Sequence, residues 1–73
     1  MRIQLAWKLA LAHEKIAMMH QEYGMWLFEE NELTKAVRIA NDARLPSASR
    51  LSLMLAEAKE RRIAAGIRRR KPA

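Results

Sequence analysis

The sequence predicts an all-α fold, a small three-helix domain followed by a disordered basic tail. The chain has 73 residues, which allows one thin domain. Apolar residues recur at helical spacing along most of its length. Gly24, Pro46 and Gly66 divide it into three segments of helix length. We therefore expect a helical domain over residues 1–66 and a tail over 67–73.

The first segment, residues 2–22, has the clearest helical pattern. It contains no proline or glycine, and its Ala, Leu, Lys, Glu and Met residues favour helix. Gly24 is placed to end it with a left-handed cap. Six apolar residues recur at i, i+4, i+7, i+11, i+14 and i+18, and this stripe is the predicted buried face. Its members are Leu5, Leu9, Ala12, Ile16, Met19 and Tyr23.

A second apolar stripe, formed by Trp7, Leu11 and Met18, lies far around the same helix. A helix on the surface of a globular domain needs only one such stripe. Either the helix is sandwiched inside the fold, or one face is kept for a partner. On the second interpretation these three residues are the candidate partner-binding site.

Three of the four aromatic residues lie between Tyr23 and Phe28. Large rings dominate the apolar area that a small domain can bury, so we expect the core to form at this elbow between helices. Both Trp26 and Phe28 are predicted to pack with Leu5, Leu9 and Ile16 or with Val37. The alternative is that Trp26 or Phe28 stays exposed as a binding anchor.

The second helix is predicted to start at Asn31, a favoured N-cap, and to fade near Ala43 before Pro46. A short extra helical turn over 25–30 is left open. Ser47 is the expected N-cap of a third helix that runs to about Ala65. The predicted inner faces are Leu33, Ala36, Val37 and Ala40 on the second helix, and Leu51, Met54, Leu55 and Ala58 on the third.

The whole net charge of +6 lies at the C-terminal end, because residues 1–60 hold eight basic and eight acidic residues. Such an end is either a solvated arm or a contact for nucleic acid or an acidic protein surface. Arginine dominates it, and a guanidinium binds phosphate or carboxylate in a bidentate fork. The candidate contact residues are Arg61, Arg62, Arg68, Arg69, Arg70 and Lys71.

Catalytic and metal-binding patterns are missing from the sequence, so we expect neither an enzyme nor a cofactor. His13-Glu14 lacks the second histidine of the zinc-protease helix motif, since position 17 is Ala17. No cysteine is present. No segment resembles a signal peptide closely or reaches the length of a membrane span, which favours a cytoplasmic protein with no membrane partner.

The second and third helices can be compared with a helix-turn-helix, in which Arg50 would enter the major groove of DNA. Arg44 stands where that motif usually has glycine, and Arg50 where it usually buries an aliphatic residue. A plain helical hairpin explains the same residues. A DNA-binding repressor or excisionase-type factor is therefore the alternative function.

From Met1-Arg2-Ile3-Gln4-Leu5 to the final Arg68-Arg69-Arg70-Lys71, the chain resembles the small bacteriophage-encoded regulators of bacterial RNA polymerase in length, helical character and overall style. The resemblance implies a non-enzymatic protein in the host cytoplasm that binds the β′ N-terminal region and the β flap. It also implies inhibition of initiation, with loss of the σ factor, and antitermination through suppressed RNA hairpins. No motif carries site residues over from the family.

Overall fold

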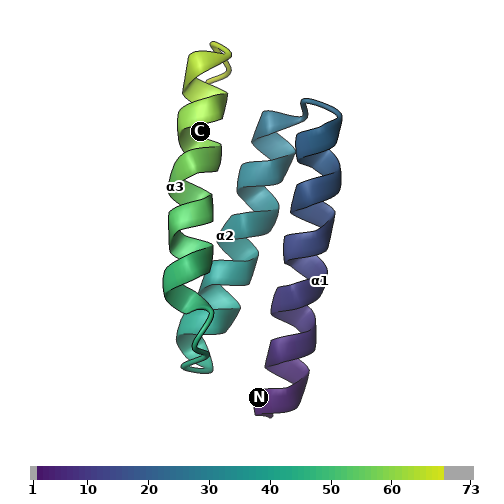
Figure 1. The fold of residues 1–73 in the computed structure, drawn as a ribbon, viewed down its shortest axis with the longest axis vertical. Helices are drawn as coiled ribbons and strands as arrows, with labels where there is room; N and C mark the ends of the chain where they lie inside the picture. Colours follow the sequence, from purple (N-terminus) through teal and green to yellow (C-terminus); the bar gives the residue numbers. More distant parts are fainter. Residues whose placement is uncertain (1, 69–73) are drawn as a thin grey trace, which may run out of the picture.

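A computed structural model of the chain describes residues 2–68 and contains three helices in that range. They are α1 (Ile3–Glu22), α2 (Trp26–Asp42) and α3 (Ala48–Ala64). α2 lies between the other two and runs antiparallel to both (Figure 1). α1 and α3 each pack along α2 and have little contact with each other. The predicted three-helix, all-α fold is confirmed.

Each helix ends in the same way, with a Schellman motif that lets the chain turn back at once. At the end of α1, the Gly24 amide donates to Gln21 and the Met25 amide to the His20 carbonyl (3.1 and 2.9 Å). The same pair of hydrogen bonds closes α2 around Arg44 and α3 around Gly66. All three central residues have positive φ, at 67°, 54° and 76° in chain order. The predicted stops at Gly24 and Gly66 are confirmed.

The core between the helices consists mainly of alanine. Its fully buried apolar residues are Ala6, Ala10, Ala17, Leu33, Ala36, Ala40, Leu45, Leu51 and Ala58. Small side chains let helix backbones approach closely, so little volume remains for large ones. The predicted inner faces of α2 and α3 are confirmed, with Val37, Met54 and Leu55 partly buried at the edge of this core.

The predicted buried face of α1 is wrong. Leu5, Ile16, Met19 and Tyr23 are 40–77% exposed. The helix instead packs on α2 with Ala6, Ala10 and Ala17, which we call the alanine row. This row lies between the two large apolar stripes. Both stripes therefore flank the α1–α2 contact.

The predicted aromatic core at the elbow is also wrong. Tyr23 is 77% and Phe28 53% exposed, while Trp26 is half-buried. The turn itself is where the sequence placed it. Phe28 stacks on the His20 ring, with centroids 5.6 Å apart, and does not enter the core.

The start of α2 differs from its prediction, because the helix begins at Trp26 rather than at Asn31. The open possibility of helix over 25–30 becomes the first turn of α2. α3 begins after Ser47 as expected, although the Ser47 side chain makes no capping hydrogen bond. Of the predicted tail, only Ile67 and Arg68 belong to the described residues, and the prediction for 69–73 lies outside them.

Candidate protein-binding surface

The predicted partner-binding residues Trp7, Leu11 and Met18 lie on α1 with 49%, 42% and 44% of their surface exposed. We call these three residues the Trp7 stripe. Trp7 and Leu11 line a small recess of about 50 Å³ whose other wall includes Ser47, Arg50 and Leu51. The Trp7 stripe therefore follows the edge of α1 that faces α3, beside the alanines that pack on α2.

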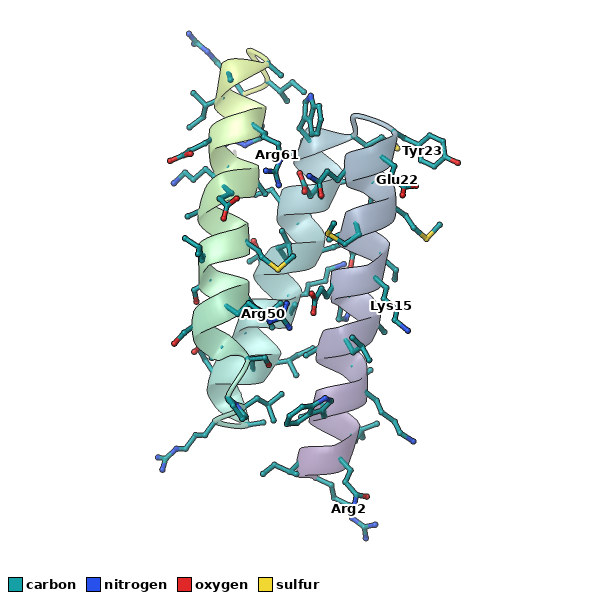
Figure 2. All side chains as sticks on the ribbon, in the orientation of Figure 1. Arg2, Lys15, Glu22, Tyr23, Arg50 and Arg61 are labelled. Atoms are coloured by element: carbon teal, nitrogen blue, oxygen red, sulfur yellow. The ribbon has the colours of Figure 1, made fainter. Side chains whose placement is uncertain are left out.

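A charged bridge crosses from α3 to α1 beside this stripe. The Arg50 guanidinium donates two hydrogen bonds to the Glu14 carboxylate, at 2.6 Å to Oε2 and 3.0 Å to Oε1. These hydrogen bonds hold the pKa of Glu14 below its ordinary value and raise the pKa of Arg50. Figure 2 shows Arg50 directed from α3 toward α1, across the face of α2. Arg50 is thus engaged within the fold rather than presented to DNA.

A second polar contact joins α1 to α2 at His13. Its Nδ1 lies 2.6 Å from Oε2 of Glu32, whose other oxygen accepts from Lys35 at 3.4 Å. Burial raises the pKa of Glu32, but the hydrogen bonds from His13 and Lys35 outweigh it and leave the pKa below its ordinary value. Among residues 2–68 no group of three potential metal ligands occurs.

Two ion pairs with buried carboxylates join α2 to α3 at the ends farthest from their connecting turn. Arg61 donates to both carboxylate oxygens of Glu29, at 2.8 and 3.4 Å, and Arg62 donates to Glu30. Glu29, Glu30 and Arg62 are at most 7% exposed. The Arg62 Nη1 also donates to the Ile67 carbonyl at 2.8 Å.

These pairs give Arg61 and Arg62 a role different from the predicted contact with nucleic acid or an acidic surface. The pKa of Arg61 is raised, first by its hydrogen bond to Glu29. Of the other candidate contact residues, Arg68 is exposed, while Arg69, Arg70 and Lys71 lie outside the described residues. The basic residues that remain for the predicted contact therefore begin at Arg68, after the two arginines that form the ion pairs.

The sequence held a signal for the two pairs that the prediction missed. Two adjacent acids stand at the start of one predicted helix region, and two adjacent arginines stand near the end of the next helix. In an antiparallel hairpin those ends meet, so matched pairs of opposite charge there predict ion pairs across the hairpin.

No protein family, curated protein or solved structure was found to match this chain. Within residues 2–68, the helices are too short or too polar to cross a lipid bilayer.

Proposed function

We propose that this chain is a non-enzymatic regulator that binds a large protein through the Trp7 stripe. The observation that carries the proposal is the exposure of Trp7, Leu11 and Met18 beside a core built from alanine. Large exposed apolar surface on a small domain is a mark of interaction sites. Tryptophan is also among the residues most enriched at energetic centres of interfaces.

The setting of the stripe supports a docking role. Trp7 and Leu11 share a recess with the start of α3, and the Glu14–Arg50 bridge fixes the two helices on either side of it. A partner side chain that enters this recess meets apolar walls with a charged rim. That combination is typical of the core and rim of protein interfaces.

The partner that we propose is bacterial RNA polymerase, in the cytoplasm of the host, at its β′ N-terminal region and β flap. This identification rests on the resemblance to phage-encoded regulators, as do the proposed inhibition of initiation and the antitermination. The exposed Arg68 and the basic residues 69–71 would add contacts to phosphate or carboxylate groups. Arg61 and Arg62 no longer belong to that set.

The helix-turn-helix alternative receives no support from the arrangement of α2 and α3. In that motif the two helices meet at roughly 90–120°. Here they lie antiparallel (Figure 1), and ion pairs hold their far ends together. We therefore do not propose a DNA-binding function for this chain.

Retention of purified bacterial RNA polymerase by the immobilised full-length chain tests the proposal. Trp7→Ala should weaken binding by about 2 kcal/mol, or about 30-fold, because it removes the largest ring of the stripe. Leu53→Ala is the matched control, since Leu53 is 63% exposed on α3 and outside the stripe. Equal binding by the wild type, Trp7→Ala and Leu53→Ala would contradict the stripe, and no retention of polymerase would contradict the partner.

A further inference from the structure

The second apolar face of α1, on the side away from α3, has no partner within the described chain. It consists of Leu5, Leu9, Ala12, Ile16, Met19 and Tyr23, which we call the outer strip. Four of them are at least 40% exposed, and Tyr23 reaches 77%. Figure 2 shows Tyr23 and Lys15 pointing outward from the side of α1 that is remote from α3.

The spacing of the outer strip is that of a coiled-coil seam. Consecutive members are separated alternately by four and by three residues, from Leu5 to Tyr23. This places every member at an a or d position of a heptad repeat, the pattern that packs one helix against another along its length. A strict two-in-seven stripe is narrower than the face a helix needs for burial in a globular core.

We propose that the outer strip is the interface of a homodimer, in which α1 packs antiparallel against α1 of a second copy. The spacing reads the same in both directions, so a two-fold axis brings a and d positions together throughout. Leu5 then faces Tyr23 of the second copy, Leu9 faces Met19, and Ala12 faces Ile16. The Leu5–Tyr23 and Ala12–Ile16 layers each pair a smaller residue with a larger one, and Leu9 and Met19 are of similar size.

The charges beside the strip favour the antiparallel direction. Lys8, Lys15 and Glu22 occupy the g positions, are exposed, and have no ion-pair partner among the described residues. In the antiparallel register Lys8 of each copy lies near Glu22 of the other, which gives two symmetric ion pairs. The two Lys15 residues lie near the axis and repel each other, which offsets part of this gain.

A parallel arrangement lacks this complementarity. It would set Lys8 and Lys15 beside His13 and His20 of the second copy, and it would place two Ala12 side chains in one layer, where they leave space unfilled. The edge of the outer strip opposite Lys8 and Lys15 has further apolar surface, because Phe28 is 53% exposed where it stacks on His20.

The dimer differs from the proposed polymerase contact in location and in what it requires. The Trp7 stripe lies on the edge of α1 that faces α3, whereas the outer strip faces away from it. The dimer needs no other protein. Trp7→Ala should therefore leave the dimer unchanged, so the two proposals can fail separately.

Sedimentation equilibrium of the full-length chain over a range of concentrations is the first test. We expect a reversible monomer–dimer equilibrium. Ile16→Glu should raise the dimer dissociation constant at least about 100-fold, because it places two carboxylates in an apolar seam. Leu53→Glu introduces the same charge on α3 and should change nothing. Monomer at every concentration, a larger assembly, or equal effects of the two variants would overturn the proposal.

Charge exchange tests the register with surface changes that leave the apolar strip intact. Lys8→Glu and Glu22→Lys should each weaken the dimer about tenfold, and the double variant should recover wild-type affinity. Lys15→Gln should tighten the dimer, since it removes the repulsion at the axis. Failure of the double variant to recover would contradict the antiparallel register.

Cross-linking tests whether the two α1 helices of the dimer run antiparallel. Because the chain has no native cysteine, a thiol-reactive reagent can join only the introduced ones. A mixture of Leu5→Cys and Tyr23→Cys chains, treated with a short thiol-reactive cross-linker, should give the mixed product. Each variant alone should give little product. Efficient cross-linking of Leu5→Cys with itself would show a parallel dimer and overturn the antiparallel arrangement.

Discussion

The two extensive helix–helix contacts within residues 2–68 use different means. α1 packs on α2 through a row of alanines, Ala6, Ala10 and Ala17, with one polar contact from His13. α2 packs on α3 through Leu51 and Ala58 and through two ion pairs whose carboxylates are buried. Alanine fixes the distance between helices, whereas matched charges fix how far one helix slides along the other. The comparison explains why the large side chains of α1 lie outside.

The largest expected effect comes from the α2–α3 contact. Arg62→Met leaves the buried Glu30 carboxylate without its guanidinium and removes the bond to the Ile67 carbonyl. Breaking a buried pair costs about 3–5 kcal/mol, which urea unfolding measures. The double variant Glu30→Leu with Arg62→Met should recover most of this loss. Arg38→Met, at an exposed position on α2, is the control; if it costs as much as Arg62→Met, the loss does not come from the buried pair.

The α1–α2 contact should respond to added volume instead. Ala10 is 3% exposed in the alanine row, so Ala10→Leu forces the helices apart and should cost about 1–3 kcal/mol. Ala56→Leu adds the same volume at an exposed position of α3 and should have little effect. Thermal unfolding of the two variants makes the comparison. Wild-type stability of Ala10→Leu would show that these helices are not closely packed.

The turns of the two contacts carry different residues at the position with positive φ. Gly24 ends α1 at φ 67°, whereas the equivalent residue after α2 is Arg44 at φ 54°. The left-handed region strains a side-chain-bearing residue, so Arg44→Gly should stabilise the protein by about 0.5–1 kcal/mol after the entropy of glycine is counted. Gly24→Ala should have the opposite sign, because alanine is strained at φ 67° even though a new Cβ has room, with the Trp26 ring no nearer than 3.7 Å. A loss of stability in Arg44→Gly, measured by urea unfolding, would contradict this account.

The smallest effect is expected at the bridge between α1 and α3. The pKa of Glu14 is lowered by Arg50, so the folded state holds this proton less tightly than the unfolded state. The bridge contributes stability above the ordinary pKa of 4.5, and this contribution is lost as the pH falls through the lowered pKa. Because Arg50 is largely exposed, the contribution should stay below about 1 kcal/mol. Stability curves from pH 7 to 2.5 should be flatter for Glu14→Gln than for the wild type; parallel curves would contradict the assignment.

The ends of the helices and the inner faces of α2 and α3 could be predicted because they depend on local signals. Gly24, Pro46 and Gly66 punctuate the chain, and Leu33 and Leu51 stand on unambiguous faces. Such signals lie within one turn of the residue they affect. They need no knowledge of which helix packs on which.

The buried face of α1 could not be predicted by ranking side chains by size. Its two large stripes compete as burial candidates, and the face that packs is the alanine row between them. The start of α2 was missed for a related reason. Glu29 and Glu30 look like the end of an apolar run, but arginines more than thirty residues away make their burial favourable. The Trp7 stripe was identified from its spacing, and its exposure follows from the choice of face.

The alanine row has a consequence for the thermodynamics of unfolding. On folding, an alanine side chain loses no rotamer freedom, and it buries little apolar area. The heat capacity of unfolding grows with the apolar area that unfolding exposes. For the single chain it should therefore fall below the usual value of roughly 12–15 cal/mol/K per residue. The curve of stability against temperature is then unusually flat. Cold weakens such a fold less than it weakens one held by leucine and phenylalanine.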